Sequence, residues 1–128
     1  MARLGDIMTA DAFSVPPDAA VADVVGNMVK RRLGSALVTQ GSMLVGIFTE
    51  RDVLRAAASG RDLIASKVSE WMTAHPVTCE PDTDSEEAAE VMLRDGFRHL
   101  PVVDGSKVVG VVSLRDLLSA RIRRRPIA

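Results

Sequence analysis

Two short segments of the chain carry residue types that could hold a polar ligand. Residues 46–52 read GIFTERD, residues 110–116 read GVVSLRD, and 64 positions separate them. In each, a hydroxyl residue stands where a strand pattern gives way to a helical one, and an aspartate follows three positions later. The N–H groups of a first helical turn attract phosphate, and an ionised carboxylate can accept both vicinal hydroxyls of a ribose. The pattern is therefore suited to a nucleotide.

The same residues have a second interpretation that requires no ligand. A Thr or Ser at a helix N-cap with an acid three positions later forms a capping box. Two features favour a ligand. The acid is Asp in both segments, Asp52 and Asp116, whereas Glu or Gln is the usual capping partner. An arginine, Arg51 or Arg115, precedes it both times.

A further polar cluster, residues 98–101 (RHLP), precedes a predicted strand. One interpretation is an exposed basic pair before a strand that begins with proline. The other places Arg98 or His99 near a phosphate. The matching positions in the first half, residues 34–37, read GSAL. The two halves therefore differ chemically here, and two sites built from them should differ in affinity.

Composition excludes several classes of function. The chain has 128 residues, 47% of them hydrophobic and 26% charged, with a formal net charge of −1. Such a chain has no overall field for nucleic acid or an anionic membrane, so we expect neither as a partner. The basic run at residues 121–125 (RIRRR) is interpreted as a solvated tail, with a phosphate or partner contact as the alternative.

The single cysteine, Cys79, makes an intramolecular disulfide impossible and fits a reducing compartment. No stretch approaches the roughly 18 apolar residues of a membrane span. We therefore predict a cytoplasmic protein. His75 and His99 form no metal-ligand spacing, and we find no catalytic carboxylate pair, nucleophile–base arrangement or Walker-type loop. The sequence therefore predicts neither a metal site nor an enzyme.

An internal repeat organises the chain. A shift of 64 positions matches residues 8–54 to residues 72–118 without a gap, including Met-Thr-Ala at 8–10 and 72–74. We expect a mixed α+β fold of two β-α-β-β-α repeats related by a pseudo-twofold axis. The predicted boundaries are 1–60 for the first repeat, 61–67 for a connector, 68–122 for the second repeat and 123–128 for a basic tail.

Hydrophobic periodicity and turn residues predict the same elements in each half: a helical turn, an extended piece, a helix, a hairpin and a final helix. In the first half these are residues 4–8, 13–15, 19–32, 36–39 with 44–48, and 50–59. In the second half they are residues 68–72, 77–79, 84–95, 100–103 with 108–112, and 114–123. Thr83 with Glu86, or Asp84 with Glu87, is predicted to cap the helix that begins there, and Gly96 to end it.

These residues resemble a known family. The segments DIMT (6–9), EWMT (70–73), HPVT (75–78) and FRHLPVVD (97–104), together with both Gly-x-x-Thr/Ser-x-x-Asp units, resemble a tandem pair of cystathionine-β-synthase (CBS) domains, or Bateman module. The resemblance covers nearly the whole chain. It implies a disc-shaped homodimer, and it implies adenosine-containing ligands bound in two clefts between the repeats. It also implies regulation of another protein, so far unidentified.

The resemblance also implies the members of each cleft. The first would use Thr49, Arg51, Asp52, Val77, Thr78, Arg98, His99 and Leu100. The second would use Ser113, Arg115, Asp116, Phe13, Ser14, Gly34, Ser35 and Ala36. In each cleft the Asp would hold the ribose, the hydroxyl would approach the first phosphate, and apolar strand residues would flank adenine.

We therefore hypothesise a stand-alone regulatory module that binds AMP, ADP or ATP, with Mg²⁺ accompanying ATP and no cofactor required. The alternative is a structural or protein-interaction module. In it the Thr/Ser-x-x-Asp units are helix caps only, and no ligand binds.

Overall fold

The computed structural model describes residues 2–124 and has the expected mixed α+β fold. The chain forms two compact units. One is Ala12–Pro76, here called the middle unit, and the other joins Met1–Asp11 to Val77–Ala128, here called the split unit. Arg125 of the basic run lies outside the described residues, whereas the run up to Arg124 belongs to the last helix.

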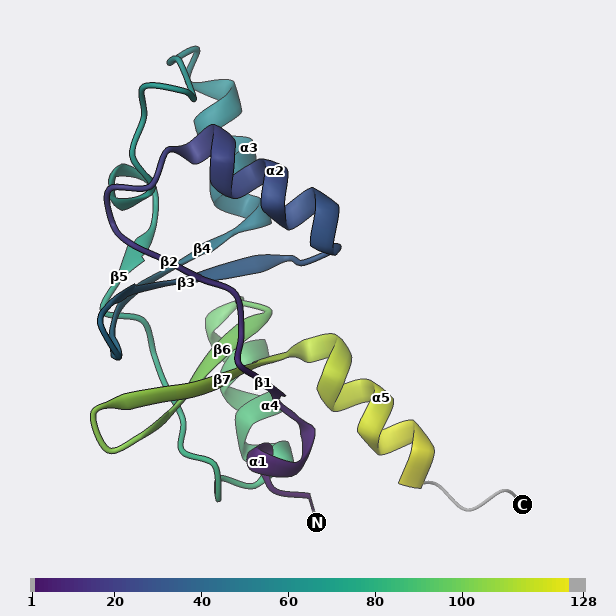
Figure 1. Cartoon of the computed structure of the whole chain (residues 1–128). Coiled ribbons are helices and arrows are strands. Elements are labelled where there is room, and N and C mark those ends of the chain that lie inside the picture. The colour runs from purple at the N-terminus through teal and green to yellow at the C-terminus, as the bar shows by residue number, and fades with distance from the viewer. Residues whose placement is uncertain (1, 125–128) are drawn as a thin grey trace. The chain divides into compact units, whose positions relative to one another are not determined.

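In the middle unit, two helices accompany a sheet in the strand order β2-β3-β4-β5 (Figure 1). The β2 strand is parallel to β3, and the remaining neighbours are antiparallel. The elements are β2 (Ser14–Val15), α2 (Val21–Arg31), β3 (Ser35–Gln40), β4 (Met43–Thr49), α3 (Glu50–Ala58), the 3₁₀ turn η1 (Val68–Glu70) and β5 (Thr73–Ala74).

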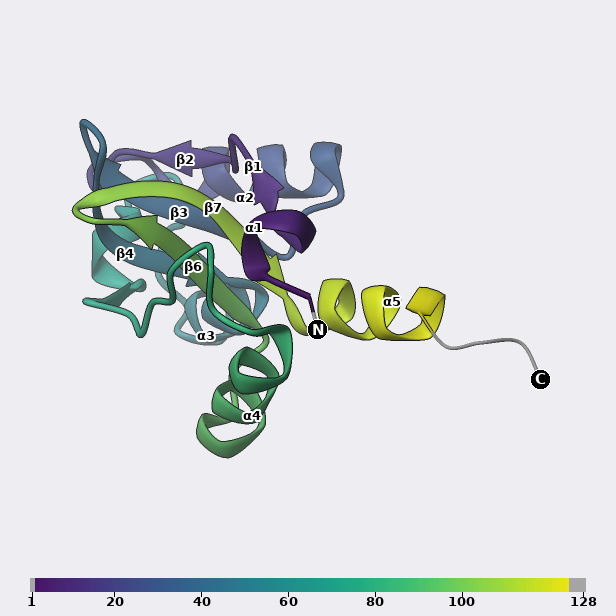
Figure 2. The same ribbon diagram turned by 90° about the horizontal axis from the view of Figure 1, so that it is seen from below.

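In the split unit, the antiparallel order is β1-β7-β6 (Figure 2). Its elements are α1 (Leu4–Ile7), β1 (Thr9–Ala10), α4 (Ser85–Asp95), β6 (His99–Asp104), β7 (Lys107–Ser113) and α5 (Leu114–Arg124). The extended piece predicted at residues 77–79 is reduced to a single parallel bridge from Cys79 to Val102. The Cys79 N–H donates to the Pro101 carbonyl over 3.0 Å, so this segment still borders β6.

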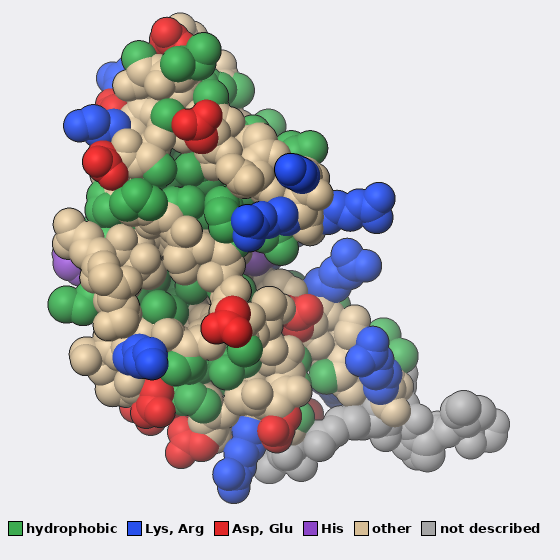
Figure 3. All heavy atoms as spheres, viewed as in Figure 1, with side chains coloured by type: hydrophobic (Ala, Val, Ile, Leu, Met, Phe, Trp, Pro, Cys, Tyr) green, Lys and Arg blue, Asp and Glu red, His purple; other side chains and the backbone are tan. Residues whose placement is uncertain are grey.

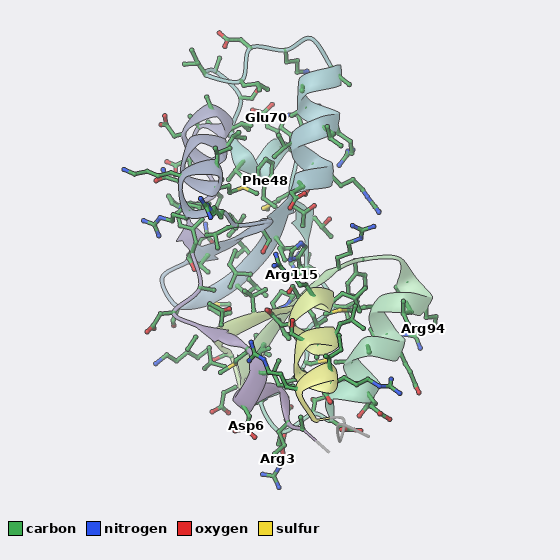
Figure 4. The ribbon with its side chains drawn as sticks, turned by 90° about the vertical axis from the view of Figure 1, so that its right-hand side faces the viewer. Arg3, Asp6, Phe48, Glu70, Arg94 and Arg115 are labelled. Carbon is green, nitrogen blue, oxygen red and sulfur yellow. The ribbon has the colours of Figure 1, made fainter. Side chains whose placement is uncertain are left out.

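Each unit has its own apolar core, and the helices contribute to it at the predicted 3.6-residue spacing. Phe48 is fully buried and lies between α2 and α3 (Figure 4). The middle core contains Val15, Val21, Val24, Met28, Ala36, Val38, Phe48, Ala56 and Val68. The split core contains Leu4, Ala88, Met92, Leu100, Val102, Val112 and Leu117. Both sets come mainly from one face of each helix and from the central strands.

The segment that begins each sequence repeat packs on the sheet formed by the other repeat. The N–H groups of Leu4 and Gly5 donate to the carbonyls of Thr83 and Pro81 over 3.0 and 2.7 Å, and β1 pairs with β7. Likewise the N–H of Val68 donates to a carbonyl of the middle unit, and β5 pairs with β4. The units therefore group the chain differently from the sequence repeat.

The pairing of β1 and β5 with the strands of the other repeat, here called the exchange, explains the glycine of each Gly-x-x-Thr/Ser-x-x-Asp unit. A Cβ added at Gly110 would stand 2.7 Å from the Thr9 carbonyl oxygen and 2.8 Å from the Met8 sulfur. At Gly46 it would collide with the Met72 sulfur and stand 3.0 Å from the Thr73 oxygen. A glycine in a strand marks a close approach of a ligand or of another backbone, and here it is a backbone.

The predicted capping pair of α4 is wrong. The N-cap is Asp84, but its side chain makes no capping hydrogen bond, and its Oδ1 is buried without a partner among the described residues. The Thr83 hydroxyl instead accepts from the Glu80 N–H over 3.2 Å. Instead, the Ser85 N–H donates to the Ala2 carbonyl, in the segment before α1, over 2.8 Å, so tertiary contacts replace the local cap. Gly96 does end the helix, in the left-handed region with φ 79°.

Through residues 2–124, no helix combines the length and apolar character that crossing a membrane requires.

The close approach at Gly46 predicts a large difference between two glycine substitutions. Gly46→Ala should lower the free energy of unfolding by about 2 kcal/mol, because the methyl group forces Met72 and the Thr73 backbone to shift. Gly26→Ala is the matched control, since nothing lies within 4 Å of an added Cβ in α2. It should raise stability by about 0.5–1 kcal/mol through helix propensity. Urea unfolding measures both, and equal effects would contradict the assigned contact.

Candidate functional site

The Thr49–Asp52 unit forms a capping box at the start of α3. The Asp52 Oδ2 accepts from the Thr49 backbone N–H over 2.9 Å and from its hydroxyl over 3.3 Å. The Asp52 Oδ1 accepts from Arg55 Nη1 over 3.0 Å. Asp52 is buried, with 4% of its surface exposed. Both oxygens of this carboxylate are therefore engaged within the middle unit.

The Ser113–Asp116 unit forms the equivalent arrangement at the start of α5. The Asp116 Oδ2 accepts from the Ser113 backbone N–H over 2.9 Å, and the Ser113 hydroxyl accepts from the Asp116 N–H over 3.0 Å. The capping interpretation is thus realised in both repeats. It leaves room for a ligand, because a carboxylate has about four acceptor positions and capping uses only some of them.

The middle unit brings further predicted residues close to its capping box. Ser35 pairs with Thr49 across β3 and β4, and both Ser35 and Ala36 are buried. On the other side of β3, the Phe13 carbonyl accepts from the Leu37 N–H over 2.9 Å, which places Phe13 and Ser14 on the neighbouring strand segment. These residues therefore occupy three adjacent strands of one sheet.

A cation covers the Phe13 ring. The Arg31 guanidinium carbon lies 4.7 Å from the ring centroid. Arg31 belongs to the basic last turn of α2, and on the face shown in Figure 3 Lys and Arg side chains gather at this end of the helix. Elsewhere on that face, acidic and basic side chains are interspersed. The sequence analysis did not select Arg31.

The split unit brings together the remaining predicted residues. His99 pairs with Ser113 across β6 and β7, and the Arg98 carbonyl accepts from the Leu114 N–H over 2.8 Å. Leu100 is buried, while Arg98, Val77 and Thr78 are exposed. Arg115 is exposed on the first turn of α5 (Figure 4). Both clefts implied by the resemblance combine residues of the two units, and they stay predictions.

Residues 2–124 give little support for a metal site or for a reactive cysteine. No group of three or more His, Cys, Asp or Glu side chains there could hold a metal ion. Burial raises the pKa of the Cys79 thiol, and the nearby Glu87 raises it further, against a smaller lowering by a hydrogen bond with Thr83. A raised pKa reduces the thiolate fraction at neutral pH, which is the opposite of what an activated nucleophile requires.

The sequence analysis missed one residue at the capping box itself. Arg55 follows Asp52 by three positions, a spacing at which side chains on a helix meet. Its guanidinium carbon also lies 5.6 Å from the centroid of the Trp71 ring, and that of Arg61 lies 5.7 Å away. The Trp71 ring itself packs against the middle core.

Comparison with known proteins identifies the family. The CBS domain model matches residues 4–59 and 68–123. The CBS domain-containing protein YhcV of Bacillus subtilis is 34% identical over 118 residues, which are 91% of this chain and 84% of that protein. A CBS-domain containing protein from Agrobacterium tumefaciens has a solved structure with a TM-score of 0.87 and 30% identity, covering 94% of this chain and 99% of that one. The chain therefore belongs to the CBS domain family and contains a tandem pair of these domains.

The solved relatives include complexes with a nucleotide. The CBS domain protein PAE2072 from Pyrobaculum aerophilum, complexed with AMP, has a TM-score of 0.84 and 31% identity. The alignment covers 90% of this chain and 89% of that one. Recognition of the family from the two repeated motifs is thus confirmed.

The capping boxes predict matched stability losses. Thr49→Ala and Ser113→Ala should each lower the free energy of unfolding by about 1 kcal/mol, because a helix N-cap loses its side chain. Ser106→Ala, at an exposed turn residue, is the control and should change stability by less than about 0.5 kcal/mol. Urea unfolding followed by circular dichroism measures all three. Losses no larger than that of the control would show that the boxes do not stabilise α3 and α5.

Proposed function

We propose that this CBS pair is a regulatory module that binds an adenine nucleotide (AMP, ADP or ATP) in clefts between its two repeats. The observation that carries the proposal is the doubled capping box: each one presents a carboxylate, a hydroxyl and a neighbouring arginine at a helix N-terminus. The AMP bound to the relative from Pyrobaculum aerophilum supports the ligand class.

In the proposed first cleft, Asp52 holds the ribose and Thr49 approaches the first phosphate. An ionised carboxylate accepts two hydroxyl donors, and the helix N-terminus with a nearby cation favours an anion. The cleft would be completed by Arg51, Val77, Thr78, Arg98, His99 and Leu100.

In the proposed second cleft, Asp116 and Ser113 take the same roles. Arg115 is exposed beside them and is available to a phosphate. The cleft would be completed by Phe13, Ser14, Gly34, Ser35 and Ala36. The Arg-His pair of the first cleft has no counterpart at residues 34 and 35, so we expect the two clefts to differ in affinity.

The proposed role is regulatory and not catalytic. The carboxylates of the site serve as hydrogen-bond acceptors to a capped helix, and the described residues around them include no nucleophile with an adjacent base. A bound nucleotide would shift the relative populations of conformations or assemblies only through its differential affinity for them. The output would be a changed interaction with a protein target or a second copy of the chain. Mg²⁺ would accompany ATP only.

Exposed apolar residues at matching repeat positions support a homodimer. Val29 of α2 and Leu93 of α4 are 74% and 71% exposed, and Leu54 of α3 and Leu118 of α5 are 71% and 52% exposed. A shift of 64 relates the two members of each pair. Large apolar residues exposed at equivalent places on both units are typical of surfaces that a partner covers. We propose that a second copy covers them.

Nucleotide binding predicts a rise in thermal stability. AMP, ADP or ATP at a hundredfold excess over its dissociation constant should stabilise the folded chain by about 2.7 kcal/mol, because it binds the folded state only. A thermal-shift panel with and without Mg²⁺ measures this. Asp52→Ala and Asp116→Ala should each remove the part of the thermal shift that comes from one cleft. The shift of each variant is measured from its own ligand-free midpoint.

Asp95→Ala is the control for that panel, since Asp95 is an exposed carboxylate that pairs with its neighbour Arg94, outside the proposed site. Its response to nucleotide should equal that of the wild type. A flat panel for the wild type would reject nucleotide binding and favour a ligand-free interaction module. A normal response in the double Asp52→Ala, Asp116→Ala variant would reject the assignment of the site.

If the chain is a homodimer, introducing charged residues into the proposed interface should lower its molecular mass in solution. The double variant Leu54→Glu, Leu118→Glu should be a monomer where the wild type is a dimer, because burial of two carboxylates in an apolar interface is costly. Ile64→Glu, at a residue that is 77% exposed outside the helices, should keep the mass of the wild type. Light scattering coupled to size-exclusion chromatography measures all three. A monomeric wild type would overturn the dimer.

A further inference from the structure

The two aspartates differ in what contacts them besides their own capping partners. Arg55 Nη1 lies 3.0 Å from Asp52 Oδ1, and the opposite oxygen accepts from Thr49. The Asp52 side chain is 6% exposed and the Arg55 side chain 59%. A largely exposed guanidinium therefore covers the second oxygen of a buried carboxylate.

An aromatic ring helps to hold that guanidinium in place. Arg55 lies over Trp71 at a distance where cation–π attraction is effective. Trp71 itself is packed against the middle core, so the ring is a fixed support. Arg61 lies over the same ring but pairs with Glu70, at 3.5 Å, and has no contact with Asp52 among the described residues. Of these two cations, Arg55 is the one that links the ring to the capping box.

The second repeat lacks both groups. A shift of 64 places Ser119 at the position of Arg55, and Ile7 is the counterpart of Trp71. The capping hydrogen bond at Asp116 runs from the Ser113 N–H to Oδ2. No arginine therefore stands three positions after Asp116, whereas the Arg55 guanidinium already occupies an acceptor position of the Asp52 Oδ1.

We propose that Arg55 competes with the ribose for Asp52, so that a nucleotide binds first at Asp116. This inference rests on the proposed function and gives the direction of the difference between the clefts. A ribose diol at Asp52 must displace the guanidinium and loses the Asp52–Arg55 ion pair. At Asp116 the position of Arg55 is taken by Ser119, which carries no charge. Displacement also removes one of the two cations from Trp71, so the emission of that ring should report occupation of the Asp52 cleft.

Isothermal titration with AMP tests the competition. Asp116→Ala isolates the Asp52 cleft, and in that background Arg55→Ser should tighten binding about fivefold, equivalent to about 1 kcal/mol. Arg61→Ser in the same background is the matched control. It removes the other cation from Trp71 but leaves Asp52 untouched, so the affinity should not change. Asp52→Ala alone should retain the tighter of the two wild-type sites.

Tryptophan fluorescence supplies an independent readout, because Trp71 is the only tryptophan of the chain. Saturating AMP should change the emission of Asp116→Ala but leave that of Asp52→Ala unchanged. The Arg55→Ser, Asp116→Ala variant should already show altered emission without ligand and should change little on binding.

The outcomes separate this inference from the function on which it rests. Unchanged or weaker binding after Arg55→Ser would overturn the competition while nucleotide binding stands, and weaker binding would indicate that Arg55 contacts the ligand. Retention of the tighter site by Asp116→Ala, and not by Asp52→Ala, would overturn the order of binding. If AMP, ADP and ATP bind neither the wild type nor any variant, the proposed function fails and the inference with it.

Discussion

Both sheets depend on the pairing of a two-residue strand with a glycine-bearing strand. Gly46 lies opposite Ala74 and Gly110 opposite Ala10, at points where a neighbouring carbonyl and a methionine sulfur take the place of a side chain. Each short strand belongs to the sequence repeat whose own hairpin lies in the other unit. The chain therefore crosses between units twice, and the strand that ends at each capping hydroxyl is bordered by a segment of the other repeat.

The sequence predicted most of the elements but not this exchange. The periodicity of α2 and α4 and the hairpin turns at Gly41 and Gly105 are local signals, and the structure agrees with them. Two-residue strands show no periodicity, and the partner of a strand is a long-range property that a local pattern does not encode. The only sign of the exchange in the sequence was the repeated Met-Thr-Ala triplet. Each copy of the triplet packs against a strand glycine.

The candidate site, like the fold, was predicted in part from the sequence. Residue types and spacing gave both the capping box and the ligand acceptor, and the structure contains the box in both repeats. The role of Arg55 could not be predicted in the same way. Its substitution by Ser119 is visible in the repeat, but its contact with Asp52 depends on a side-chain conformation supported by Trp71, a residue 16 positions further along.

Capping would favour the proposed ligand binding in this arrangement. A carboxylate already held by a backbone N–H has little side-chain freedom left to lose when a diol binds, so the box preorganises the acceptor. Aspartate suits this better than glutamate because it has one fewer rotatable bond to fix. The box is common to both repeats, whereas the arginine on Asp52 is not. Two clefts of shared chemistry and unequal affinity would respond over a wider range of nucleotide concentration than two equal ones.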